Sequence, residues 1–155
     1  MTLYVILRLE RRDWMFKLIG GINTAGKTMY LEDLYLSDAA SYNFIGYDND
    51  RIRNSETCRE LPVVEASDNR VLVILDLLCR CDRNILVDEI DSYVHPADRH
   101  VVYSFLKDIS KEVDVIAATH DIQLTSYGDK YYTVTSDMFV VDLQEITEEE
   151  YRNIV

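Results

Sequence analysis

The chain has 155 residues, enough for one globular domain with a core, and its 48% hydrophobic and 28% charged residues are ordinary for a soluble protein. Sixteen basic against 28 acidic residues give a formal charge of −12, which repels a phosphate backbone unless the basic groups gather on one face, so the charge gives no support for direct nucleic-acid binding. The longest apolar runs are far shorter than a membrane span, and no apolar signal segment begins the chain, so we expect no membrane association and a cytoplasmic location.

The first part of the chain predicts two strands and a helix. Leu3–Leu9 and Trp14–Ile19 are β-rich runs separated by the charged segment 10–13, which suggests strands joined by a turn. Lys27–Leu36 has helical periodicity, with four apolar residues available for burial: Met29, Leu31, Leu34 and Leu36. Tyr42–Tyr47 then predicts a short strand, whereas residues 48 to 60 are polar and contain no readable element.

The rest of the chain alternates helices with strands. The expected elements are a helix over Arg70–Arg80, a strand over Asn84–Asp88, a helix over Ala97–Lys111, a strand over Val113–Ala118, and a hairpin of Lys130–Thr135 with Met138–Leu143 that turns at Ser136-Asp137. Thr147 and Glu150 form a capping box at the start of a last helix. This order predicts one α/β domain over residues 1–155, with a mostly parallel sheet, helices on both faces and an antiparallel hairpin at the C-terminal end.

A phosphate-binding loop follows the second strand. Residues 21 to 28 match the pattern G-x-x-x-x-G-K-[ST], and such a loop turns backbone N–H groups toward phosphates at a helix N-terminus. Lys27 would reach the outer phosphates, and Thr28 would bind magnesium. The candidate nucleotide-binding residues are Gly21, Asn23, Thr24, Ala25, Gly26, Lys27 and Thr28.

Two acids end the strand Asn84–Asp88, at the edge where ligands bind in open α/β sheets. Asp88 would hold magnesium together with Thr28, and Glu89 would orient or deprotonate the water that attacks the γ-phosphate. His120 follows the next strand and is the candidate γ-phosphate sensor. His95 is expected near the site or at a subunit contact, and His100 on the surface of a helix.

These motifs together resemble the ABC-type P-loop ATPases, in the branch of the SMC-like, RecF-like and overcoming-lysogenisation-defect (OLD) ATPases. Gly21-Ile22-Asn23 through Thr28 looks like the loop of that branch with its third-position Asn. Residues 88–96 look like its Walker B and D-loop segment, and Ala118-Thr119-His120-Asp121 looks like its switch histidine.

The resemblance implies a P-loop NTPase three-layer sandwich in which the strand before His120 lies between the phosphate-loop strand and the Walker B strand. It also implies ATP and Mg²⁺ as cofactors, and ATP held between two such domains. The partner would be a second copy of the chain or another ATPase subunit, and the family suggests a nuclease or DNA-repair partner.

Three features depart from that family. Only about 40 residues separate Thr28 from Arg70, so the usual helical insertion is nearly absent and the chain is a minimal form. The signature motif should fall in residues 63–69, but this segment contains no glycine, and Glu65 and Asp68 place negative charge there. The Q-loop glutamine is missing, with Asn43 or Asn49 as speculative substitutes, and Tyr4 or Trp14 as aromatic candidates for stacking on adenine.

Three functions are compatible with these features. The leading hypothesis is Mg²⁺-dependent ATP binding with slow hydrolysis by a minimal ABC/OLD-type ATPase, coupling the nucleotide state to association with itself or a partner. The alternative is a nucleotide-responsive interaction subunit with little or no turnover, which the degenerate signature favours. A small kinase is the third, and its lid arginines would have to be Arg51 and Arg53.

Overall fold

The computed structural model describes residues 14–21, 24–46, 57–62, 69–137 and 140–155. Its strands are β1 (Phe16–Gly20), β2 (Tyr42–Gly46), β3 (Cys58–Glu60), β4 (Asn84–Asp88), β5 (Val115–Ala118), β6 (Lys130–Asp137) and β7 (Val140–Ile146). Its α-helices are α2 (Thr24–Ser37), α3 (Arg70–Cys79), α4 (Arg99–Ile109) and α5 (Glu148–Ile154). Short 3-10 helices are η1 (Ala39–Ser41), η2 (Ile90–Ser92), η3 (Pro96–Asp98) and η4 (Ile122–Tyr127).

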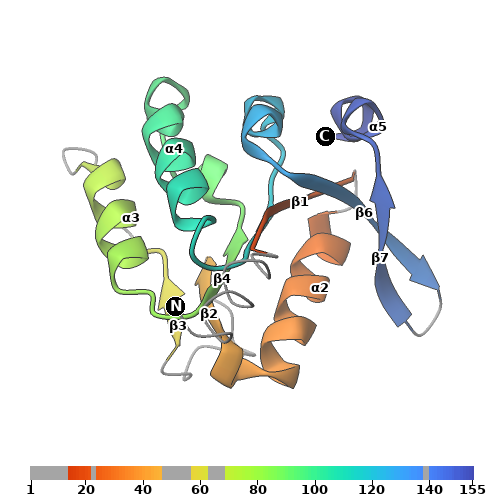
Figure 1. Ribbon diagram of the computed structural model, residues 1–155, viewed down its shortest axis with the longest axis horizontal. Helices are drawn as coiled ribbons and strands as arrows, with labels where there is room; N and C mark the ends of the chain where they lie inside the picture. The colour runs from red at the N-terminus through yellow and green to blue at the C-terminus, as the bar shows by residue number, and fades with distance from the viewer. Residues whose placement is uncertain (1–13, 22–23, 47–56, 63–68, 138–139) are drawn as a thin grey trace, which may run out of the picture.

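The described strands form one seven-stranded sheet in the order β3-β2-β4-β5-β1-β6-β7. Every neighbouring pair is parallel except β6 and β7, which pair antiparallel from Tyr131 with Ile146 to Asp137 with Val140. The predicted α/β class, the mostly parallel sheet and the antiparallel pair at the C-terminal end are therefore confirmed (Figure 1). β5 lies between β1 and β4, as the family resemblance implied.

Alternate residues of the central strands pack into different layers, because successive side chains of a strand point to opposite faces. Ile85 and Val87 belong to the cluster that α3, α4 and α5 cover, whereas Leu86 belongs to the cluster on the α2 side. Helices therefore cover both faces of the sheet, as predicted, with α2 apart from α3 and α4 in Figure 1. Among the described residues, no helix is long and apolar enough to cross a membrane.

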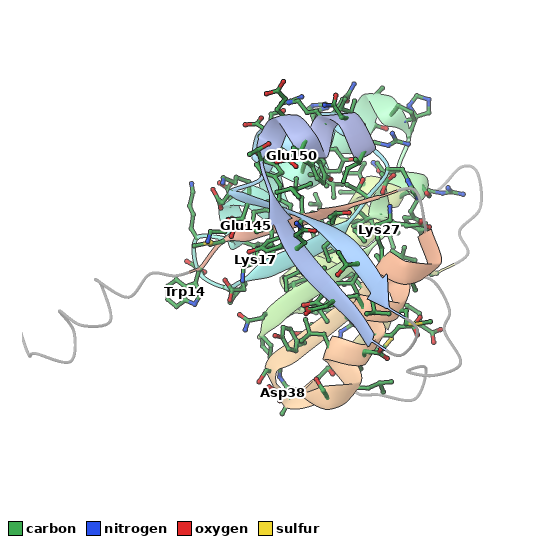
Figure 2. All side chains as sticks on the ribbon, turned by 90° about the vertical axis from the view of Figure 1, so that its right-hand side faces the viewer. Trp14, Lys17, Lys27, Asp38, Glu145 and Glu150 are labelled. Carbon is green, nitrogen blue, oxygen red and sulfur yellow. The ribbon has the colours of Figure 1, made fainter. Side chains whose placement is uncertain are left out.

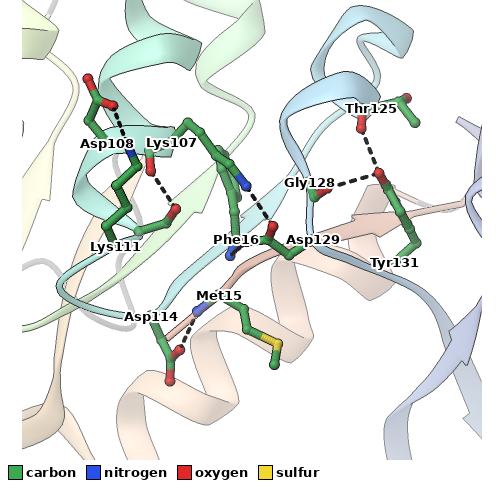
Figure 3. Close-up of polar contacts among 11 residues, drawn as sticks. Met15, Phe16, Lys107, Asp108, Lys111, Asp114, Thr125, Gly128, Asp129 and Tyr131 are labelled. Carbon is green, nitrogen blue, oxygen red and sulfur yellow. Dashed lines mark hydrogen bonds and ion pairs between the residues drawn. The ribbon is translucent and has the colours of Figure 1, made fainter. Parts of the chain in front are cut away.

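Polar contacts hold the amino end of β1 (Figure 3). The backbone N–H of Met15 donates to Asp114 Oδ1 at 3.0 Å, and that of Phe16 donates to Asp129 Oδ2 at 2.9 Å. Lys107 Nζ donates to the other oxygen of Asp129 at 2.6 Å. The start of β1 is thus tied to two neighbouring parts of the chain, which orients the strand that leads into the phosphate-binding loop.

Local capping signals define two helices. Asn69 is the N-cap of α3, and its side chain accepts from the backbone N–H groups of Val71 and Leu72. The predicted capping box of Thr147 and Glu150 is present at the start of α5. This helix is exposed along most of its length but buries Tyr151 completely.

Four details of the sequence prediction are corrected. The edge strand β3 was missed, and the β6–β7 hairpin turns after Asp137 rather than at Ser136-Asp137. Helix α4 begins at Arg99, because Pro96 first starts the separate turn η3. Leu31 is buried and Leu34 partly buried, but Met29 and Leu36, expected to be available for burial, are exposed.

Candidate functional site

Chemical groups from three adjacent strands meet at the carboxyl edge of the sheet. β1 leads into the phosphate-binding loop and α2, β4 ends at Asp88, and β5 ends just before Thr119 and His120. Because β5 pairs with both β1 and β4, residues distant in sequence are brought next to one another. Ligands bind at such edges in open α/β sheets.

The ammonium group of Lys27 is buried at the centre of this edge. Lys27 is 1% exposed, and its Nζ donates to the carbonyl oxygens of Gly21 at 3.0 Å and Thr119 at 3.4 Å. Burial lowers the pKa of Lys27, although the charges of Glu89 and Asp91 oppose this change. A buried ammonium group is costly unless it is neutralised, so an anionic oxygen at this point would stabilise it.

Thr28 and Asp88 form a second contact beside the lysine. Thr28 Oγ1 donates to Asp88 Oδ1 at 3.2 Å, and Asp88 is only 8% exposed. Burial raises the pKa of Asp88 to about 6, and the charges of Glu89 and Glu32 add to this effect while the bond from Thr28 opposes it. A Cβ on residue 46 would lie only 3.3 Å from the Cβ of Asp88, which is a tight contact. Glycine at this position avoids that contact.

The Thr28 and Asp88 oxygens suit Mg²⁺, which binds through one or two carboxylates together with substrate phosphates. The raised pKa of Asp88 reflects a buried negative charge that a divalent cation would compensate. In the part of the chain that the structure describes, no cluster of three or more His, Cys, Asp or Glu residues could hold a metal ion.

Replacing Asp88 by asparagine should stabilise the nucleotide-free protein. The folded-state pKa of about 6 lies above the reference value of 3.8, so the folded state binds the proton more tightly and the wild type loses stability as pH rises through this window. At pH 7 the Asp88→Asn variant should gain about 1–3 kcal/mol in unfolding free energy, and this gain should disappear below about pH 4. Urea denaturation at both pH values measures it.

The matched control for this stability test is Asp108→Asn. Asp108 pairs with Lys111 on the surface, where both side chains are about 70% exposed, so its replacement should change the unfolding free energy by less than about 1 kcal/mol. Equal stabilities of the wild type and Asp88→Asn at pH 7 would show that burial of the Asp88 carboxylate carries no cost.

Glu89 has an unusual backbone conformation. Its φ of 53° makes it the one non-glycine residue with positive φ in the described ranges. Its N–H donates to the carbonyl oxygen of Ala118 at 2.9 Å, and its Oε1 lies 3.2 Å from His120 Nε2. A left-handed conformation in a residue other than glycine is unfavourable and persists where the surroundings impose it, commonly at functional sites.

His120 connects the acid to the lysine. Both of its ring nitrogens lie 3.4 Å from Lys27 Nζ, and Nε2 also contacts Glu89. The side chain is 41% exposed, so it borders solvent above the buried lysine. The structure thus brings together five predicted residues: Lys27, Thr28, Asp88, Glu89 and His120.

Several predicted positions lie outside what the structure describes. Asn23 is one, as are residues 63–68 of the expected signature segment, Asn49, Tyr4, and the arginines Arg51 and Arg53. Thr24, Ala25 and Gly26 belong to the first turn of α2, as a phosphate-binding loop requires, but nothing is described of the side chains of Thr24 and Ala25.

Other candidates are placed away from the site. Asn43 is buried at the start of β2 and accepts from the backbone N–H of Asp82, so it cannot replace a Q-loop glutamine. Trp14 precedes β1, far from Lys27 in Figure 2, and this position does not support adenine stacking. His100 is exposed as expected, whereas His95 caps η3 and lines a cavity of about 650 Å³ whose described lining residues include none of the five site residues.

Sequence reasoning missed three contributors. Asp91 is buried and accepts from the His120 backbone N–H at 3.4 Å; Thr119 contributes only its carbonyl oxygen to Lys27; and Glu32 is buried one helical turn after Thr28. The i, i+4 spacing of Thr28 and Glu32 could have indicated a shared helix face. No local pattern indicates the contact made by Asp91, because it depends on the pairing of β4 with β5.

The strand order, with a phosphate-binding loop after β1 and two acids after β4, defines a P-loop NTPase-type fold. No protein-family model matches the chain. The chain is 31% identical over 87 residues to "DNA repair protein RecN" of Aquifex aeolicus (strain VF5), a match that covers 53% of this chain and 16% of that protein. It is thus distantly similar to the ABC-type P-loop ATPases of the SMC and RecN branch, as its motifs suggested.

Solved structures that share part of this fold include a head domain of an Smc protein. It is the Smc head domain with a coiled coil and joint derived from Pyrococcus yayanosii, with 22% sequence identity and a TM-score of 0.44. The match covers 54% of this chain and 17% of that chain.

Proposed function

We propose that this protein binds ATP with Mg²⁺, hydrolyses it slowly, and couples its nucleotide state to association with itself or a partner. The observation that carries the proposal is the 3.4 Å contact between Lys27 Nζ and the ring of His120, which joins residues 93 positions apart. Around this contact lie the Thr28–Asp88 pair and the Glu89–His120 pair.

Lys27 binds the outer phosphates in this proposal. Its ammonium group is already desolvated, so a phosphate oxygen gains a charge-assisted bond without the cost of stripping water from the lysine at the moment of binding. Thr28 and Asp88 would hold Mg²⁺, which when bound would supply positive charge to the phosphates as the γ-phosphoryl group passes to water and ADP leaves. The backbone N–H groups at the N-terminus of α2 would supply further donors.

Glu89 acts on the attacking water, and His120 senses the phosphate. The carboxylate of Glu89 orients this water or takes its proton, and its bond to His120 Nε2 holds the side chain over the site. Because His120 also contacts Lys27, it is placed to respond to the phosphate that Lys27 binds. We therefore assign Glu89 as the base and His120 as the phosphate sensor.

Association remains part of the proposal because of the resemblance to SMC and RecN proteins. The partner would be a second copy of this chain or another ATPase subunit, and the similarity to RecN suggests a DNA-repair setting. The match spans only 16% of RecN, so the coiled-coil and partner functions of longer proteins are not transferred to this chain. A cytoplasmic location stays a prediction.

The solution mass of Glu89→Gln with and without ATP and Mg²⁺ tests the proposal. We expect ATP to be retained and the mass to double, because a blocked base preserves the ATP-bound state. Multi-angle light scattering gives the mass, and Lys27→Ala under the same conditions is the control that should remain a monomer. ATP binding without a mass change would contradict self-association of this chain, and absence of binding would contradict both functions.

A further inference from the structure

Asp91 is a buried acid for which the proposed reaction has no role. It lies in η2, three residues after Asp88, and is 5% exposed. Its Oδ2 accepts from the backbone N–H of His120 at 3.4 Å. Asp91 therefore contacts the segment that presents the His120 ring to Lys27 and Glu89.

The second oxygen of Asp91 needs a donor. Oδ1 is buried, and no hydrogen-bond partner for it exists among the described residues. Buried carboxylate oxygens in native proteins are almost always paired, because an unpaired one loses its water without compensation. A suitable donor for Oδ1 would be equally buried and would lack a partner of its own.

Tyr151 of α5 provides such a donor. It is fully buried, and its hydroxyl has no partner in the described ranges. Tyr151 packs in the same apolar cluster as Ile90, the residue next to Asp91. Burial first, and then the charge of Asp91, raise the pKa of Tyr151, so the phenol keeps its proton at neutral pH and can donate it.

Tyr151 also contacts the entrance of the phosphate-binding loop. A Cβ at Gly20 would lie 2.8 Å from the Tyr151 ring, so the tyrosine fits against the end of β1 only because this residue is glycine. On its other side, Tyr151 packs on Tyr131 with a ring-centroid distance of 5.2 Å. Tyr131 is itself fixed by hydrogen bonds to the carbonyl oxygens of Thr125 and Gly128 (Figure 3).

We propose that Asp91 is a positioning residue that acts through His120, and that the Tyr151 hydroxyl supports it by donating to Oδ1 through one buried water. This chain of hydrogen bonds links the C-terminal helix to the phosphate sensor. The inference rests on the proposed function in assigning a reaction to His120, but the hydrogen bonds themselves do not depend on it. Buried waters that join two or more such groups are regular parts of protein structures.

Asp91→Leu and Asp91→Asn are a matched pair of similar volume. Leucine removes both acceptors, whereas asparagine keeps one acceptor for the His120 N–H. In nucleotide-free protein, we expect Asp91→Leu to increase amide hydrogen exchange at His120 by about tenfold, and Asp91→Asn to keep it near the wild-type rate. Unchanged exchange at His120 in Asp91→Leu would overturn the proposal.

The kcat and KM of Asp91→Leu for ATP distinguish a positioning role of Asp91 from a general loss of structure. We expect Asp91→Leu to reduce kcat by about tenfold with KM for ATP changed by less than about threefold, because the sensor is misplaced while Lys27 still binds phosphate. In a His120→Ala background, the same substitution should have no further effect on kcat. A full effect in that background would refute action through His120.

Tyr151→Phe tests the second half of the proposal by the sign of its effect. If the hydroxyl donates to Asp91, its removal lowers the melting temperature and increases exchange at His120; if it is unpaired, its removal raises the melting temperature. Tyr131→Phe is the control, since it should lower the melting temperature without changing exchange at His120. If the wild type showed no ATP turnover, only the proposed function would be disproved. The proposed hydrogen bonds would still be tested, because hydrogen exchange and melting are measured without nucleotide.

Discussion

The Glu89→Gln variant should bind ATP as the wild type does and hydrolyse it about 10²–10⁴ times more slowly. Glutamine has nearly the same size as glutamate, so it preserves the packing of the segment that follows β4. It cannot, however, take a proton from water. The contact with His120 Nε2 at 3.2 Å can persist through the side-chain carbonyl oxygen, which keeps the sensor in place. Single-turnover hydrolysis and binding of a fluorescent ATP analogue measure the two effects separately.

Glu112→Gln is a suitable control for the loss of charge. Glu112 is exposed and follows the C-terminal end of α4, away from the carboxyl edge of the sheet that carries the site. Its replacement should leave both binding and turnover unchanged. Equal hydrolysis by the wild type and Glu89→Gln would remove Glu89 from the role of base.

The Lys27→Ala variant should lose ATP binding. Charge-assisted hydrogen bonds contribute about 1.5–3 kcal/mol each, so loss of the ammonium group should weaken ATP affinity by at least about tenfold to a hundredfold. Lys27 is 1% exposed and contacts the ring of His120. Its removal therefore also removes the contact between α2 and the proposed phosphate sensor. Isothermal titration calorimetry with ATP and Mg²⁺ measures the loss.

Lys17→Ala controls for the general effect of removing a positive charge from an acidic protein. Lys17 is on β1, near the opposite end of the strand from the loop, and Figure 2 labels both lysines. The control should bind ATP with wild-type affinity. Circular dichroism should show both variants folded, and wild-type affinity in Lys27→Ala would contradict the nucleotide site itself.

The fold could be predicted well where the signal is local. β4 begins and ends at the predicted residues, because a continuous apolar run that ends in an acid is typical of a buried parallel strand. β3 was missed, because Cys58–Glu60 is a short polar edge strand that gains its hydrogen bonds from β2 rather than from its own pattern. The hairpin turn was misplaced for a similar reason, since register depends on the partner strand.

In the candidate site, too, the residues with a local sequence signal were predicted and those that depend on tertiary contacts were missed. Lys27 with Thr28, and Asp88 with Glu89, are recognisable from sequence because each pair lies in one short motif with a fixed spacing. His120 was identified because it follows a strand, and its approach to Lys27 agrees with that expectation. Asp91 and Tyr151 were missed, because each looks like an ordinary residue of a turn or an exposed helix until its burial is known.

The sequence by itself determined the phosphate-binding loop, the acids at the end of β4 and the α/β class, because these depend on local spacing and on the alternation of apolar residues. Tertiary structure alone decided that β5 separates β1 from β4 and that α5 packs on Gly20. Those arrangements arise from strand pairing and from side-chain packing between segments far apart in the sequence, such as Gly20 and Tyr151. The loop between Gly21 and Thr28 thus indicates a nucleotide, and the fold around it supplies the buried charges with which it would act.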